Sequence, residues 1–80
     1  MPFQKKTLEQ NLGDVIRTRR EETGLSQEKL AFEADLHRTY ISQLERGIKS
    51  PTLRAIVSIA NALQIPADEL VRLAISKNNE

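Results

Sequence analysis

The sequence of 80 residues has no cysteine, only one histidine and no long apolar stretch. The lack of cysteine excludes a disulfide framework and a cysteine metal site, and a single histidine cannot build a histidine metal cluster. No apolar run approaches the ~20 residues needed to cross a bilayer, and the N-terminus lacks the apolar core of a signal peptide. We therefore expect a cytoplasmic protein with no metal, no cofactor and no membrane contact.

Catalytic patterns are absent as well. The sequence contains neither a phosphate-binding glycine loop nor a nucleophile-base pair at a suggestive spacing, so an enzyme is the weakest function class. Eighty residues make one domain, and a chain this short buries only ~60% of its unfolded surface, so help from a partner subunit would be unsurprising. No separate ligand-sensing domain is present, and we expect no small-molecule ligand.

The charge is nearly balanced, with a net value of +1, and says nothing by itself about nucleic acid. Its distribution is more informative. Between Arg38 and Arg54 there are four basic residues and one acid, whereas most acids lie elsewhere. An ordinary solvated charge pattern would also explain this distribution, so the case for DNA depends on the motif in the same region.

Two short apolar patterns with helical spacing lie between Ser26 and Gly47. The apolar positions are Leu30, Ala31 and Ala34 in the first pattern, and Tyr40 or Ile41, then Leu44, in the second. The connection around Asp35 is too short for a loop and contains no proline, which predicts a helix-turn-helix. Aspartate is one of the few residues that enter the left-handed region at low cost, as this turn requires.

The outward positions of the second helix carry donors and hydroxyl groups and no acid. They are Arg38, Thr39, Ser42, Gln43 and Arg46. Such an edge can hydrogen-bond base edges in a major groove and reach the flanking phosphates. We predict that Arg38, Thr39 and Gln43 read bases.

A longer pattern surrounds this motif. Its residues are Leu25-Ser26-Gln27-x-x-Leu30-Ala31, Tyr40-Ile41-Ser42-x-Leu44-Glu45-Arg46-Gly47 and Pro51-Thr52-Leu53. The pattern resembles the Cro and phage-repressor type of helix-turn-helix, the XRE family, over roughly Leu12 to Leu73. Within that family, the run from Arg38 to Ser42 and the small size resemble the controller proteins of restriction-modification systems.

The resemblance implies roles for individual residues. It implies an ion pair between Arg20 and Glu45 that joins the first helix to the end of the recognition helix. It also implies phosphate contacts from the N-terminal end of the second helix and from the loop after the third. The implied phosphate contacts are Gln27, Arg46, Lys49 and Ser50. Tyr40 either packs inward or contacts DNA near the operator centre, and we favour the DNA contact.

The flanking sequence completes an all-α, compact five-helix bundle. Residues 1–6 are expected to be a flexible leader, residues 7–75 the DNA-binding domain with a C-terminal dimerisation helix, and residues 76–80 a polar tail. Thr7 begins a capping box, Ser26 and Thr52 cap later helices, and Gly24 ends the first. Phe32 is interpreted as a core residue.

The fifth helix and the turn before it carry more apolar side chains than one small bundle can bury. We place a homodimer interface on these residues: Ile65, Leu70, Val71, Leu73, Ala74 and Ile75. The leading hypothesis is a homodimeric regulator of transcription that binds a palindromic operator in double-stranded DNA, as activator or repressor. The alternative is an antitoxin-like interaction module that binds a partner protein through its C-terminal helix.

Overall fold

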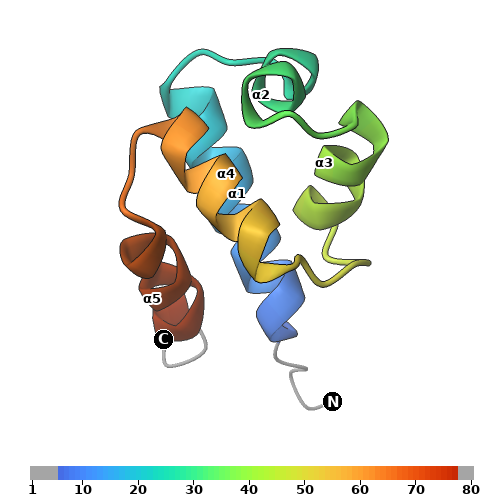
Figure 1. The fold of residues 1–80 in the computed structure, drawn as a ribbon. Helices are drawn as coiled ribbons and strands as arrows, with labels where there is room; N and C mark the ends of the chain where they lie inside the picture. Colours follow the sequence, from blue (N-terminus) through green and yellow to red (C-terminus); the bar gives the residue numbers. More distant parts are fainter. Residues whose placement is uncertain (1–5, 78–80) are drawn as a thin grey trace.

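The computed structural model describes residues 6–77, and within this range it contains five helices and no strand. They are α1 (Leu8–Glu22), α2 (Gln27–Ala34), α3 (Arg38–Glu45), α4 (Leu53–Leu63) and α5 (Ala67–Lys77). The predicted all-α bundle with a helix-turn-helix is confirmed. In Figure 1, α4 crosses in front of α1, the pair α2–α3 lies on one side of them and α5 lies on the other.

Local capping explains where the helices begin. The Thr7 hydroxyl accepts from the Gln10 backbone N–H at 3.0 Å, and the Gln10 side chain accepts from the Thr7 N–H at 2.9 Å. The hydroxyl groups of Ser26 and Thr52 cap α2 and α4 by accepting from the backbone N–H of Lys29 and Ala55, whereas His37 precedes α3 without a side-chain cap. These hydrogen bonds satisfy donors that a helix N-terminus leaves unpaired.

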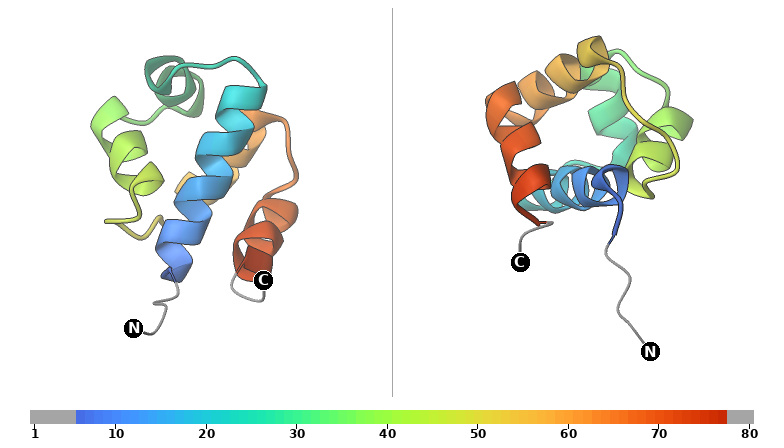
Figure 2. Two further views of the ribbon diagram at one scale, coloured as in Figure 1. Left: turned by 180° about the vertical axis from the view of Figure 1, so that it is seen from behind. Right: turned by 90° about the horizontal axis from the view of Figure 1, so that it is seen from below.

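One apolar core joins all five helices. Its largest fully buried side chains are Ile16, Leu30, Ile41, Leu44, Ile59, Leu63 and Leu70. Helix α1 contacts both α3 and α5, and α2 contacts both α3 and α4. Seen from below, α4 lies on the side of the bundle opposite α1, with α5 and the α2–α3 pair on the two flanks (Figure 2).

The expectation that Phe32 belongs to the core is wrong. Phe32 is 78% exposed, because α2 packs through Leu30, Ala31 and Ala34 while Phe32 projects from the opposite face. The Lys29 ammonium group lies over its ring, 5.6 Å from the ring centroid. The apolar face of α4 is also narrower than its composition indicates, since Leu53 remains 79% exposed.

The proposed dimerisation residues do not share one surface. Ile65, Leu70 and Ala74 are buried within the bundle, because α5 packs its inner stripe against the rest of the core. They are not surplus apolar surface, and that part of the expected interface is wrong. Val71 and Leu73 are half-buried and Ile75 is exposed.

The ends of the chain differ from the expected boundaries. Of the predicted leader, residues 1–5 lie outside the described residues, and Lys6 forms an ion pair with Asp14 at 2.7 Å. Of the predicted tail, residues 78–80 lie outside them, while Ser76 and Lys77 form the last turn of α5. Among residues 6–77, no helix combines the length and hydropathy needed to span a membrane.

Candidate nucleic-acid interface

The turn between α2 and α3 has the geometry that the sequence predicts. Asp35 adopts a left-handed backbone, with φ 58° and ψ 45°. The chain then reverses sharply, and the Leu36 N–H donates to the Ala31 carbonyl at 2.8 Å. Ala31 is itself buried, as expected for a small side chain between two closely packed helices. The turn therefore fixes α3 against α2 through backbone hydrogen bonds.

Helix α3 buries one face and presents the other. Ile41 and Leu44 are fully buried, while Arg38, Thr39 and Arg46 are exposed and Ser42 and Gln43 are half-buried. The only acid in the helix, Glu45, is 5% exposed and turns inward. The outward edge consequently carries cations, hydroxyl groups and an amide with no carboxylate among them.

The buried Glu45 carboxylate is the centre of a hydrogen-bonded brace. Arg20 binds it in a fork, with Nε to Oε2 at 2.6 Å and Nη2 to Oε1 at 2.9 Å. Gln27 Nε2 donates to the same Oε1 at 3.0 Å, and Arg20 Nη1 donates to the Leu25 carbonyl at 2.9 Å. The brace thus joins α1, the start of α2 and the end of α3. Its hydrogen bonds raise the pKa of the Arg20 guanidinium above its usual value, so the group remains charged at every accessible pH.

A glycine in α1 allows the brace to close. A Cβ atom on Gly13 would lie 2.4 Å from the Leu44 carbonyl oxygen and 2.5 Å from that of Glu45. Helix α1 therefore touches the backbone at the C-terminal end of α3 at this point. We did not predict this contact, although a glycine within a helical pattern is a recognised sign of close packing.

The loop after α3 is exposed and basic. Gly47 has φ 73° and ends the helix, with the Ile48 N–H donating to the Gln43 carbonyl at 3.1 Å. Arg46, Lys49 and Ser50 are all exposed. Within the part of the chain that the structure describes, neither Arg46 nor Lys49 has an ion-pair partner, and the same holds for Arg38. Their charges are therefore available to phosphate groups.

Tyr40 connects α3 to the start of α4. Its side chain is half-buried against the core, and its hydroxyl oxygen accepts from the Thr52 N–H at 3.4 Å. This is the inward packing that the sequence leaves open, and the contact with DNA remains a prediction. The N-terminal end of α4 is thereby held next to the recognition helix.

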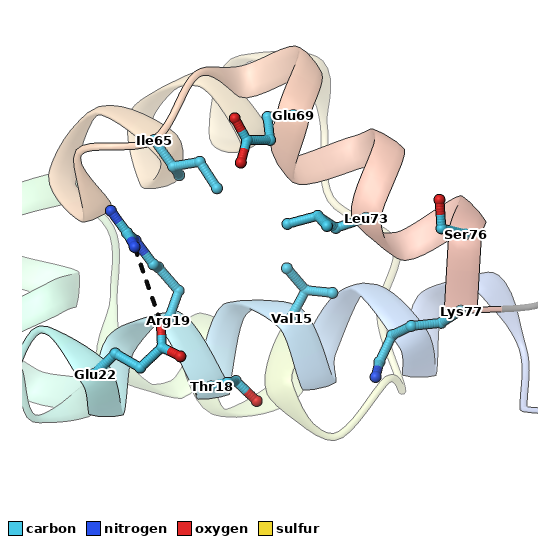
Figure 3. Close-up of a pocket in the computed structure, with 9 residues that line it drawn as sticks. All are labelled: Val15, Thr18, Arg19, Glu22, Ile65, Glu69, Leu73, Ser76 and Lys77. Carbon is cyan, nitrogen blue, oxygen red and sulfur yellow. Dashed lines mark ion pairs between the residues drawn. The ribbon is translucent and has the colours of Figure 1, made fainter. Parts of the chain in front are cut away.

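A separate hollow of about 300 Å³ lies between α1 and α5, away from α3 (Figure 3). Two of the charged residues that line it, Arg19 and Glu22, have partners: Arg19 donates to the carbonyl oxygens of Leu63 and Gln64 and lies 3.8 Å from the Glu22 carboxylate. Val15 and Leu73 point into it. The hollow is not part of the α3 surface, but it shows that Leu73 faces α1.

Comparison with known proteins supports the assignment of α2 and α3 as a helix-turn-helix motif. The model of the helix-turn-helix family matches residues 16–70. The control protein C.BamHI of Bacillus amyloliquefaciens is 44% identical over 66 residues, which cover 82% of this chain and 82% of that protein. The crystal structure of the restriction-modification controller protein C.AhdI of Aeromonas hydrophila has a TM-score of 0.76 and 40% identity, over 78% of this chain and 94% of that one. The clp gene regulator ClgR of Corynebacterium glutamicum has a TM-score of 0.88 and 25% identity, over 96% of this chain and 99% of that one.

Proposed function

The chain belongs to the helix-turn-helix family, and from this membership we propose that it is the controller protein of a restriction-modification system. It is a DNA-binding regulator of transcription, as its relatives are. As a controller it would act in the cytoplasm, without catalysis or a small-molecule ligand, and its own concentration would set the occupancy of its promoter. Sequence identity supports this subtype, because the control protein C.BamHI is 44% identical and the controller protein C.AhdI 40% identical, whereas ClgR is 25% identical.

The observation that carries the proposal is the acid-free outer edge of α3. Arg38 and Thr39 stand exposed on its first turn, and Gln43 follows one turn later on the same side. An arginine grips guanine through two acceptors and a glutamine grips adenine through an acceptor and a donor, so this edge suits direct reading of a major groove. Ser42 and Tyr40 supply hydroxyl groups beside them. A carboxylate here would repel phosphate, and the single one in the helix is buried against Arg20.

The phosphate contacts are proposed on either side of this edge. Arg46, Lys49 and Ser50 would follow one strand along the exposed loop. At the other side, Gln27 has an amide nitrogen with two hydrogens, of which one is used on Glu45. The second hydrogen can donate to a phosphate oxygen, so the group that orients α3 would also contact the backbone of the DNA.

One recognition helix spans only a few base pairs. We propose that the protein binds as a homodimer, with two α3 helices about one DNA turn apart, ~34 Å, on a palindromic operator. Selection of bound sites from a random pool of duplex DNA tests this directly. We expect an enriched sequence with twofold symmetry and half-sites whose centres are separated by about 10 base pairs.

The same selection from the random pool, repeated with the Arg38→Ala variant, provides the control. It should lose enrichment at one position of each half-site while the spacing of the half-sites persists. A pool with no enriched sequence would contradict the proposed operator. A stoichiometric complex with another protein in native purification would instead favour the antitoxin-like alternative.

A further inference from the structure

His37 is the only histidine in the chain, and it stands directly before the recognition helix α3. Its backbone is extended, with φ −76° and ψ 144°. Its carbonyl oxygen accepts a hydrogen bond from the Ile41 N–H at 3.2 Å, which is the first turn of α3. The point at which the side chain leaves the backbone is therefore fixed relative to the base-reading edge proposed above.

The imidazole ring of His37 is exposed and uncommitted. The residues before α1, α2 and α4 cap their helices with a hydroxyl group, whereas the His37 side chain caps no backbone N–H. Within residues 6–77, the ring takes part in no hydrogen bond and no ion pair. Both ring nitrogens are consequently available to a partner molecule.

The charged neighbours of His37 come from the turn, from α3 and from α4. His37 lines a groove of about 520 Å³ together with Asp35, Tyr40 and Arg54, and Arg38 follows it in the chain. In the part of the chain that the structure describes, Asp35 and the two arginines also form no ion pair. A protonated His37 therefore has no fixed counter-ion in the free protein.

We infer that the imidazolium group of His37 contacts a phosphate of the operator in each half-site, so that protonation of His37 strengthens DNA binding. The inference rests on the proposed function and adds to it a contact residue and a dependence on pH. A helix-turn-helix places the N-terminal residues of its recognition helix against base edges. His37 precedes Arg38, the first proposed base reader, and so would lie at the rim of the groove, where the phosphates run. An imidazolium donates from both nitrogens, and its charge makes a hydrogen bond to phosphate stronger than a neutral one.

Binding and protonation of His37 would then be linked. Histidine ordinarily changes its charge between pH 5 and 8, and the negative phosphate favours the charged form of the ring. The complex should consequently take up protons as it forms, and its affinity should rise as the pH falls. Because the chain has no cysteine and no second histidine, no other side-chain type in it ordinarily changes charge in this window.

Fluorescence anisotropy with a selected operator and with a random duplex, at pH 8 and at pH 6 over a range of salt concentrations, tests the inference. We expect the affinity of the wild type for both duplexes to rise by about tenfold at the lower pH, since each of two exposed ionic contacts contributes about threefold. The slope of affinity against salt should steepen by ~1.8, or ~0.9 for each added phosphate contact. His37→Gln should show neither change. His37→Arg, which is charged throughout, should have the steep slope at both pH values.

A histidine moved to another surface gives the matched control. The double variant His37→Gln, Ser76→His again has one exposed histidine, but at the end of α5, on the side of the bundle away from α3 (Figure 1). Its affinity should not depend on pH. Calorimetric titration in buffers of different ionisation enthalpy should show proton uptake on DNA binding in the wild type alone. Equal circular dichroism of all four proteins at both pH values would exclude a change of fold.

The outcomes separate the inference from the proposed function. A wild type whose affinity and salt slope are the same at pH 8 and pH 6 would overturn the role of His37 and leave operator binding intact. A His37→Gln variant or a double variant that responds to pH as the wild type does would also overturn it. A wild type that binds no duplex at either pH would overturn the proposed function as well.

Discussion

Removal of the Glu45 carboxylate should be one of the most damaging single changes in this protein. Replacing Glu45 by Met would leave the Arg20 guanidinium, whose side chain is 12% exposed, with only the Leu25 carbonyl of the three acceptors described above. It would also leave Gln27 Nε2 without its partner. Breaking a buried ion pair by removing one member typically costs about 3–5 kcal/mol, because an uncompensated charge remains in a poorly solvated place.

That cost is large compared with the stability of the whole domain. A chain of 80 residues is expected to unfold with about 4–12 kcal/mol, from the usual stability per residue. Glu45→Met should therefore remove about a quarter or more of the folding free energy. Arg20→Met should be similarly harmful, since it leaves a buried carboxylate. The double variant should recover much of the loss, because two apolar side chains of similar length can pack where the charges were.

The measurement is a double-mutant cycle by urea unfolding, followed by circular dichroism. We expect a coupling energy of about 2 kcal/mol or more between Arg20 and Glu45. The matched control is the pair Lys29–Glu33, which is 3.8 Å apart and largely exposed, and which should couple by less than about 0.5 kcal/mol. Equal coupling in the two cycles would refute the idea that burial makes the brace strong.

Other substitutions test the DNA contacts and the packing. Arg38→Ala should cost about 1–3 kcal/mol on the operator and little on random DNA, as measured by fluorescence anisotropy; equal loss on both would make Arg38 a phosphate contact. Lys49→Ala should weaken binding to every duplex and reduce the slope of affinity against salt by ~0.9, and an unchanged slope would exclude a backbone contact. Gly13→Ala should lower the unfolding free energy by about 1–3 kcal/mol, because its methyl group meets the backbone of α3, and unchanged urea unfolding would refute that close contact. Lys6 and its hydrogen bond lower the pKa of Asp14, so Asp14→Asn should cost less than about 1 kcal/mol at pH 7. This difference should disappear as the pH falls below about 4 through the lowered pKa, and a difference that persists in unfolding at low pH would point to another cause.

The sequence alone was sufficient to predict those structural features that depend on local chemistry. The caps at Thr7, Ser26 and Thr52 and the left-handed turn at Asp35 involve residues only a few positions apart, so their hydrogen bonds follow from spacing alone. The ion pair of Arg20 with Glu45 is different, because 25 residues separate the two. It was predicted only because the chain resembles a family with such a pair.

Features that depend on how the helices pack against one another could not be predicted from the sequence pattern. Periodicity shows that a helix has an apolar side, but it does not show how wide a stripe its neighbours cover. Phe32 was therefore assigned to the core although it is exposed, and Leu70 was assigned to an interface although it is buried. The close contact at Gly13 needs the crossing point of α1 and α3, which no local pattern contains.

We expect the Glu45 carboxylate to serve both folding and DNA recognition. Glu45 takes no part in the outer edge of α3, yet it fixes the end of that helix to α1 through Arg20 and to the start of α2 through Gln27. If Gln27 also donates to phosphate, the orientation of α3 is set relative to the group that contacts the DNA backbone. Such preorganisation would mean that the proposed base-reading side chains need no rearrangement of the helix on binding, so less of the binding free energy would be lost to ordering. Variants of the brace that still fold should consequently lose operator specificity before they lose their affinity for DNA in general.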